Sequence, residues 1–280
     1  MPHERFGEQP STRQRFIEDC FVICPVRIAL VSDIHGNLVA LESIASEIEE
    51  ADQVVCLGDV AASGPQPRDT LSFLRRSRWP CVLGNTDEVL AGRGKENLSR
   101  LKMPEDERQK MVSLHGWTAS KIDGADRRFL AGFKQTIEVN TRSHSILCYH
   151  GSPRSNTEKI LSTTPEDRLF EIFSGRVANV YAGGHTHEQM VRKFGSSLVV
   201  NPGSVGLPFF TDPHGDVKNP IWAEYAMLSL SGDSLRIDLR RTRYSGKALE
   251  EAVRRSGMPD PGWWLRDWVW PGREPQTRPP

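Results

Sequence analysis

The chain has 280 residues, which allows one large domain or two small ones. Its 36 basic residues balance its 36 acidic residues, so a protein that binds the backbone of a nucleic acid is not expected. No run of 18 apolar residues occurs, which argues against a membrane-spanning helix and against a membrane as partner.

Residues 1–24 lack the apolar segment of a signal peptide, and we expect them to form a poorly ordered extension. Five cysteines are present, an odd number, and none belongs to a CxxC pair. Cys56, Cys81 and Cys148 lie in apolar runs, where a reduced and buried thiol is the usual state. These features favour a reducing compartment and predict a cytoplasmic protein.

The first third of the chain alternates strand-like and helix-like segments. Short apolar runs at 26–32, 53–59 and 80–85 predict buried strands. Apolar residues at helical spacing predict helices over 38–50 and 69–76. Such alternation is typical of parallel β-α-β units in a sheet covered on both faces, and therefore of an α/β fold.

The middle of the chain is less regular. Residues 92–111 are highly charged, and we interpret them as a solvated loop with helical pieces, with a lid as the alternative. Residues 114–133 predict two short helices, and residues 165–173 predict another. From residue 135 onward the pattern is mainly that of strands. These strands are predicted at 135–140, 144–150, 177–184, 197–201, 224–230 and 234–240.

The C-terminal segment 246–280 begins with a helical pattern and then carries four tryptophans within eight positions. Our favoured interpretation is that they cover apolar surface of the protein's own body. The alternative is a contact with a partner or with a second copy in a homodimer, because exposed aromatic clusters mark interfaces. The Pro-rich end is expected to be disordered. We therefore place the main domain at residues 25–245.

Metal-compatible side chains follow five of the predicted strands at the point where each strand ends. In an open α/β sheet, ligands bind at this edge, and neighbouring glycines let the backbone turn sharply. Each motif alone is a weak signal, because a single HxH or GD pair is common, but together they indicate one site. The candidate metal ligands are Asp33, His35, Asp59, Asn85, His150, His185 and His187.

The candidate set contains two carboxylates, four imidazoles and one amide, and no thiolate. This mixture suits Mn²⁺, Fe, Zn²⁺ or Ni²⁺ better than Ca²⁺. Seven ligands exceed one tetrahedral site, so the set implies two divalent transition-metal ions. Two ions need a bridging carboxylate, and Asp59 is the candidate because it stands alone in its loop.

In chain order, the motifs SDIHGN, LGD, GN, HG and GHTH resemble those of the calcineurin-like metallophosphoesterase superfamily. The likeness is strongest to bacterial and archaeal phosphodiesterases of the YfcE type. It extends over residues 26–240 and includes SGPQP, WTASKIDGADRRFLAGF and NPGSVG. The resemblance implies a four-layer α-β-β-α sandwich of the metallo-dependent phosphatase type, with its metal site at the carboxyl ends of the strands.

The resemblance also implies how the ligands are shared and what reaction follows. One ion would be held by Asp33, His35 and His187 and the other by Asn85, His150 and His185, with Asp59 between them. The implied reaction is hydrolysis of a phosphodiester or phosphoanhydride bond by in-line attack of a hydroxide shared by the two ions. Mn²⁺ is the expected metal, and the expected substrate is a small phosphorylated molecule such as a nucleotide. The catalytic candidates are Asp59, Asn85 and His150, with Asp87 as a further candidate.

Asn37 and the NPGSVG loop are candidates for positioning the substrate, and a purely structural turn is the alternative for both. Protein phosphatases of the superfamily carry GDxxDRG and GNH[DE], whose histidine stabilises charge or protonates the leaving group. This chain has GDVAASG and GNTDE, so Thr86 replaces the histidine and its orienting aspartate is missing too. Asp87 could orient a ligand or water, with a helix N-cap as its alternative role, and His115 is another place to look for a proton donor.

Two other classes of function compete with the phosphoesterase. The vacuolar sorting subunit of retromer has a similar fold, also lacks the histidine after GN, and acts chiefly as an interaction scaffold. The complete set of seven ligands argues against a scaffold, which has no need of them. Zinc lactonases or peptidases would carry HxHxDH or HExxH, and neither pattern occurs here.

Overall fold

The computed structural model describes residues 25–94 and 103–270 of the chain. The expectations for residues 1–24 and 271–280 fall outside these ranges, as does part of the charged segment 92–111. In the ranges described, no helix is long and apolar enough to cross a membrane.

The first sheet has the strand order β11-β10-β1-β2. β1 (Val26–Val31) pairs in parallel with β2 (Gln53–Cys56), and a helix connects the two strands, as the alternating pattern predicts. β10 (Trp222–Ser231) adds antiparallel to the other edge of β1, and β11 (Ser234–Arg243) follows it as a hairpin. The sheet therefore brings strands from residues 26–56 together with strands from residues 222–243.

The second sheet has five strands in the order β3-β4-β5-β7-β6. β4, β5 and β7 run parallel, and β3 and β6 close the two edges as antiparallel strands. The strands are β3 (Ile137–Asn140), β4 (Ser145–Cys148), β5 (Val180–Ala182), β6 (Met190–Phe194) and β7 (Ser197–Asn201). β6 was not predicted from the sequence.

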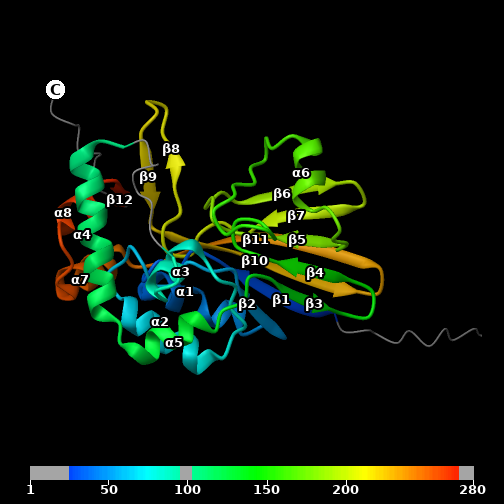
Figure 1. Ribbon diagram of the computed structural model, residues 1–280, viewed down its shortest axis with the longest axis horizontal. Coiled ribbons are helices and arrows are strands. Elements are labelled where there is room, and N and C mark those ends of the chain that lie inside the picture. The colour runs from blue at the N-terminus through cyan, green and yellow to red at the C-terminus, as the bar shows by residue number, and fades with distance from the viewer. Residues whose placement is uncertain (1–24, 95–102, 271–280) are drawn as a thin grey trace, which may run out of the picture.

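The two sheets face each other, and helices cover their outer faces (Figure 1). Ile28 and Leu30 of β1 point into a core shared with Ile146 and Val180 of the second sheet. The alternate residues of β1 pack instead on the helical layer below the first sheet, since successive strand residues point to opposite faces. This alternation explains why β1 and β2 are almost continuously apolar, and it confirms the four-layer α-β-β-α arrangement.

The outer layers differ in size. α1 (Leu38–Ile48), α2 (Pro67–Ser77) and α5 (Gly124–Ala131) cover the first sheet. Among the described helices, α6 (Glu166–Ile172) packs on the second sheet, through a cluster that includes Tyr181. The loops that carry the candidate ligands follow β1, β2, β4 and β5 at the ends of these strands, between the two helical layers.

A further group of elements packs beside the first sheet. α4 (Glu105–Lys121), α7 (Gly246–Ser256) and α8 (Pro261–Leu265) share a hydrophobic cluster with β12 (Trp268–Val269), and they lie together in Figure 1. We call these four elements the accessory unit. β12 pairs with β9 (Val217–Pro220), which forms a hairpin with β8 (Phe210–Thr211).

Two of the four C-terminal tryptophans are buried in this cluster, as the favoured interpretation requires. Trp264 is 9% exposed and Trp268 is 4% exposed, and their rings lie 5.0 Å apart. Trp263 and Trp270 pack against the same cluster with part of their surface exposed. The accessory unit therefore covers the protein's own apolar surface.

Two predictions for the elements were wrong. Residues 80–85 do not form a strand of either sheet, because only single bridges join Cys81 and Val82 to neighbouring chain, and the segment ends in α3 (Asn85–Leu90). The charged segment becomes regular at Glu105 and continues as one 17-residue helix to Lys121, where an irregular segment and a separate short helix were expected. Ion pairs along its surface stabilise this helix without an apolar stripe that the sequence would display.

Candidate metal centre

The loops that follow the strands hold their polar residues in a strained backbone conformation. A positive φ is uncommon for any residue other than glycine and persists only where the surroundings enforce it. In this chain φ lies between 48° and 67° at five candidate ligands. These are Asp33, His35, Asp59, His185 and His187.

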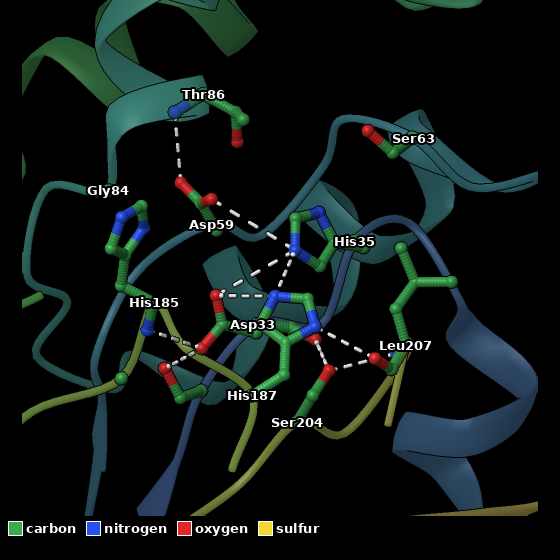
Figure 2. A network of polar contacts seen from close by, with 12 residues as sticks. Asp33, His35, Asp59, Ser63, Gly84, Thr86, His185, His187, Ser204 and Leu207 are labelled. Carbon is green, nitrogen blue, oxygen red and sulfur yellow. Dashed lines mark hydrogen bonds and ion pairs between the residues drawn. The ribbon is translucent and has the colours of Figure 1, made fainter. Parts of the chain in front are cut away.

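The first group of candidate ligands is built by Asp33, His35 and His187 (Figure 2). His35 Nδ1 donates to the carbonyl of Ala62 at 3.0 Å, and His187 Nδ1 donates to the carbonyl of Leu207 at 2.7 Å. In the neutral imidazoles both Nε2 atoms therefore carry lone pairs, and they face each other at 3.1 Å. Asp33 Oδ1 lies 3.2 Å from Nε2 of His187 and 3.7 Å from Nε2 of His35.

This convergence of acceptor atoms fits a bound cation. Two imidazole lone pairs at 3.1 Å repel each other unless a positive charge lies between them. Two nitrogens each about 2.1 Å from one ion would lie roughly 3 Å apart at a right angle, which matches the observed separation. Asp33 Oδ1 is also buried and accepts no well-aligned hydrogen bond within the described residues.

The second group is built by Asp59, His150 and His185. His150 Nδ1 donates to the carbonyl of Leu57 at 2.7 Å, so its Nε2 faces the site. That nitrogen lies 3.5 Å from Asp59 Oδ2 and 3.2 Å from the amide oxygen of Asn85. The rings of His150 and His185 are 5.1 Å apart. With the imidazoles neutral, the atoms that converge are again acceptors, which suits a cation.

Asp59 lies between the two groups. Its Oδ2 is 4.0 Å from His35 Nε2 in the first group and 3.5 Å from His150 Nε2 in the second. Its Oδ1 accepts a hydrogen bond from the backbone N–H of Thr86 at 2.9 Å, which fixes the carboxylate plane. Gly84 makes this approach possible, because a Cβ at that position would lie 2.1 Å from Asp59 Oδ1.

Asp33 is held equally firmly. Its Oδ2 accepts from the hydroxyl of Ser32 at 2.6 Å and from the backbone N–H of His185 at 3.0 Å. The second contact links the turn that carries His185 and His187 to the turn that follows β1. Gly184 must be glycine for this link, since a Cβ there would lie 1.9 Å from Ser32 Oγ.

The electrostatics of the site follow from burial and mutual charge. Burial favours neutral Asp33, but the neighbouring His187 outweighs it and holds the pKa of Asp33 well below its usual range. Burial lowers the pKa of His150, yet the charge of Asp59 raises it to about 10. Burial and the charge of His150 lower the pKa of His185 to about 4. The buried carboxylates therefore require positive charge beside them, which protons or metal ions can supply.

Residues 26–218 match the calcineurin-like phosphoesterase superfamily domain. The chain belongs to this superfamily. It is 25% identical over 263 residues to the uncharacterized protein MJ0912 of Methanocaldococcus jannaschii, covering 88% of this chain and 98% of the relative. Such a family assignment makes the protein a metal-dependent phosphoesterase, and therefore a hydrolase.

Two solved structures share the fold of this phosphoesterase. A metallophosphoesterase from Sphaerobacter thermophilus is 23% identical with a TM-score of 0.61, covering 84% of this chain and 95% of its own. The hypothetical protein PH1004 from Pyrococcus horikoshii is 18% identical with a TM-score of 0.68, covering 84% of this chain and 94% of its own. The four-layer fold is therefore that of its structural relatives.

Asn37, the substrate-positioning candidate, is engaged inside the phosphoesterase. Its side-chain oxygen accepts from the N–H of Ala40 and begins α1, and its amide nitrogen donates to the carbonyl of Gly206 and to the hydroxyl of Tyr244. The side chain is fully buried. These contacts favour the structural alternative for Asn37.

Asp87 has a structural role that the sequence did not reveal. Its carboxylate accepts hydrogen bonds from the backbone N–H groups of Asp59, Val60 and Gly84, at 2.7, 2.9 and 3.1 Å. The N-cap interpretation was wrong, because Gly84 is the N-cap and Asp87 is the third residue of α3. Burial and the charge of Asp59 raise the pKa of Asp87 to about 7. Asp87 therefore ties the Asp59 loop to the helix that carries Asn85.

Thr86 and His115 come from different helices. Thr86 follows Asn85 in α3, and its hydroxyl is buried without a hydrogen-bond partner in the described part of the chain. His115 comes from α4 in the accessory unit, and its Nε2 lies 2.8 Å from the hydroxyl of Ser63. Sequence reasoning did not single out Ser63, although it lies in the loop that Asp59 begins.

Proposed function

We propose that this phosphoesterase holds two divalent ions and hydrolyses phosphodiester or phosphoanhydride bonds. The observation that carries the proposal is the position of Asp59 Oδ2, within 4.0 Å of an imidazole nitrogen in each of the two groups. One carboxylate in this position would contact both ions. Asp33, His35 and His187 would complete the first ion's ligands, and Asn85, His150 and His185 the second's.

When bound, two such ions activate a water nucleophile and neutralise charge on the phosphoryl oxygens. The protein's own residues prepare the site for them. Backbone carbonyls lock His35, His187 and His150 so that Nε2 points inward. Mn²⁺ is the proposed metal, and the set of carboxylate, imidazole and amide ligands would also suit Fe, Zn²⁺ or Ni²⁺.

The proposed substrate is a small phosphorylated molecule such as a nucleotide. The carboxylate of Asp87 accepts hydrogen bonds from three backbone N–H groups. Thr86 has a hydroxyl where protein phosphatases carry an imidazole. A leaving group that needs little protonation suits such a site. The cytoplasm is the proposed location, since Cys56, Cys81 and Cys148 are free and buried.

The test is a Mn²⁺-loaded activity panel combined with metal analysis. The panel compares an aryl phosphodiester, an aryl phosphomonoester, a dinucleoside polyphosphate and a phosphopeptide. We expect two ions per chain and turnover of the diester or the polyphosphate. One ion per chain would contradict the two-ion proposal. Two ions per chain without turnover of any substrate would favour a scaffold.

A further inference from the structure

The loop 59–64 connects the metal centre to the accessory unit. It begins with Asp59, and the carbonyl of Ala62 accepts the hydrogen bond that fixes the ring of His35. The next residue, Ser63, contacts the accessory unit twice. Its carbonyl accepts from the indole Nε1–H of Trp264 at 2.6 Å, and its hydroxyl lies 2.8 Å from Nε2 of His115.

We propose that Trp264 and His115 are positioning residues of the metal centre, which act on the first ion through Ser63, Ala62 and His35. This inference rests on the proposed two-ion function. It makes the accessory unit, whose α7, α8 and β12 lie in the C-terminal segment 246–280 outside the predicted main domain, a part of the site. Neither residue is proposed to touch metal or substrate.

The first reason is the conformation of Ser63. Its φ is +75°, in the left-handed region that a serine rarely adopts. Such a conformation persists only where contacts on several sides hold it. Trp264 and His115 supply these contacts at the carbonyl and at the hydroxyl, and the indole of Trp264 is itself fixed by burial beside Trp268.

The second reason is the tight coupling between this loop and the turn that carries His35. The backbone N–H of His35 donates to the carbonyl of Asp59, and that of Gly36 donates to the carbonyl of Val60, both at 2.9 Å. A Cβ at Gly64 would lie 1.9 Å from the carbonyl oxygen of His35. The two segments are therefore in direct contact, and a shift at Ser63 moves the carbonyl that orients His35.

The third reason is the effect of such orienting contacts on metal affinity. A hydrogen bond to the distal nitrogen of a ligating imidazole fixes both its tautomer and its direction, and its loss typically costs 10- to 100-fold in metal affinity. Loosening Ser63 leaves the Ala62 contact in place but less well aligned. We therefore expect an effect at the lower end, about 10-fold.

The experiment compares Trp264→Phe with Trp268→Phe in the full chain. Both replace a buried indole of the same cluster by a smaller ring, but Trp264→Phe also removes the N–H that binds Ser63. The readout is Mn²⁺ affinity measured by titration calorimetry on metal-free protein, with thermal unfolding in parallel. Trp264→Phe should lower the affinity for one of the two ions about 10-fold. Trp268→Phe should retain both affinities even where it lowers the melting temperature.

Ser63 and His115 provide a second route that keeps the cluster intact. Ser63→Ala and His115→Leu each remove the hydrogen bond between the Ser63 hydroxyl and the His115 imidazole. Each should therefore lower the affinity for the same ion. The double variant should bind the ion no more weakly than the weaker-binding single variant, because both substitutions remove the same contact between Ser63 and His115. Equal affinities in wild type, Trp264→Phe and Ser63→Ala would overturn the inference and leave the two-ion proposal standing. A wild-type protein that binds only one ion would instead contradict the two-ion proposal on which this inference rests.

Discussion

At the scale of residues, the convergence of the metal-ligand candidates could be predicted, because six of them follow strands whose ends meet and Asn85 follows the apolar segment beside β2. The contacts that aim them could not. The carbonyls of Ala62, Leu207 and Leu57 orient three imidazoles, and a backbone carbonyl leaves no trace in sequence. The positive φ values of the ligands are likewise hidden, because aspartate and histidine also occur in ordinary turns.

The position of Asp59 gives the most direct prediction at this scale. Asp59→Asn removes a negative charge that both ions would share, so the variant should lose at least one ion. Activity should fall by about 10²- to 10³-fold, the usual cost of removing one group that stabilises transition-state charge. Metal analysis of the purified variant checks the first result. Two ions retained at wild-type affinity would contradict the bridging role.

Thr86 gives a prediction about leaving groups. An alkoxide leaving group needs a proton, and general acid catalysis contributes about 10²- to 10⁴-fold, whereas an aryloxide or a phosphate needs far less help. Wild type should therefore favour nitrophenyl diesters and phosphoanhydrides over phosphoserine peptides. The measurement is rate against leaving-group pKa for a series of aryl and alkyl esters.

Thr86→His is the matched variant for this series. It should reduce the dependence on leaving-group pKa only in part, because the aspartate that orients the histidine in protein phosphatases is also missing from GDVAASG. A flat dependence in wild type would mean that a proton donor acts from elsewhere.

At the scale of elements, long apolar or periodic segments were predictable and short or charged ones were not. The buried strands β1, β2 and β4 were predicted from their continuous apolar runs. α4 was not predicted as one helix because only Leu114 and Thr118 of its 17 residues are buried, so its sequence shows no apolar stripe. α3 escaped because its six residues are defined by tertiary hydrogen bonds to the Asp59 loop.

Asp87 tests how α3 is attached. Asp87→Ala would leave three backbone N–H groups without their acceptor in a buried place, and such losses should lower the free energy of unfolding by about 2–5 kcal/mol. Asp87→Asn, which keeps one acceptor oxygen, should cost less. Urea unfolding of the metal-free proteins separates the two. Equal stabilities of wild type and Asp87→Ala would show that α3 does not depend on this carboxylate.

The loop after β4 is held by Glu158, which gives a prediction of pH dependence. Its carboxylate accepts from Arg154, Arg168 and Ser152, and hydrogen bonding to Arg154 lowers the pKa of Glu158 from 4.5 to about 2. Since the folded pKa is depressed, this stabilisation is present above about pH 4.5 and is lost as the pH falls toward 2.

Glu158→Gln should therefore be less stable than wild type at pH 7, and the difference should shrink between pH 4.5 and pH 2. The measurement is urea unfolding across this range, with Glu42→Gln on the exposed face of α1 as the control. A difference that stays constant with pH would show that the carboxylate's charge is not the source of the stability.

At the scale of the whole molecule, the sequence predicted an α/β body but could not divide its strands between two sheets. β10 and β11 return to the first sheet after all five strands of the second sheet have formed. That choice depends on which apolar faces meet, which is a long-range property. The strands β8, β9 and β12 are too short or too polar for a periodic signal.

The accessory unit gives the prediction at this scale. The sequence alone suggests that residues 261–280 can be deleted without effect on the metal site, since no ligand lies there. The structure predicts otherwise, because deletion removes Trp264 and Trp268 from a closed cluster. Loss of a buried tryptophan costs about 3–5 kcal/mol, so losing two approaches the 5–15 kcal/mol that stabilises a typical domain.

The truncated chain should therefore melt at a much lower temperature and bind Mn²⁺ less tightly. Val269→Ala, at a position that is 42% exposed in the same segment, should change stability by less than about 0.5 kcal/mol and serves as the control. Thermal unfolding gives the first result, and light scattering of the same samples gives the mass. A smaller particle at an unchanged melting temperature would show that these tryptophans act between subunits, because packing within one chain cannot be lost without a loss of stability.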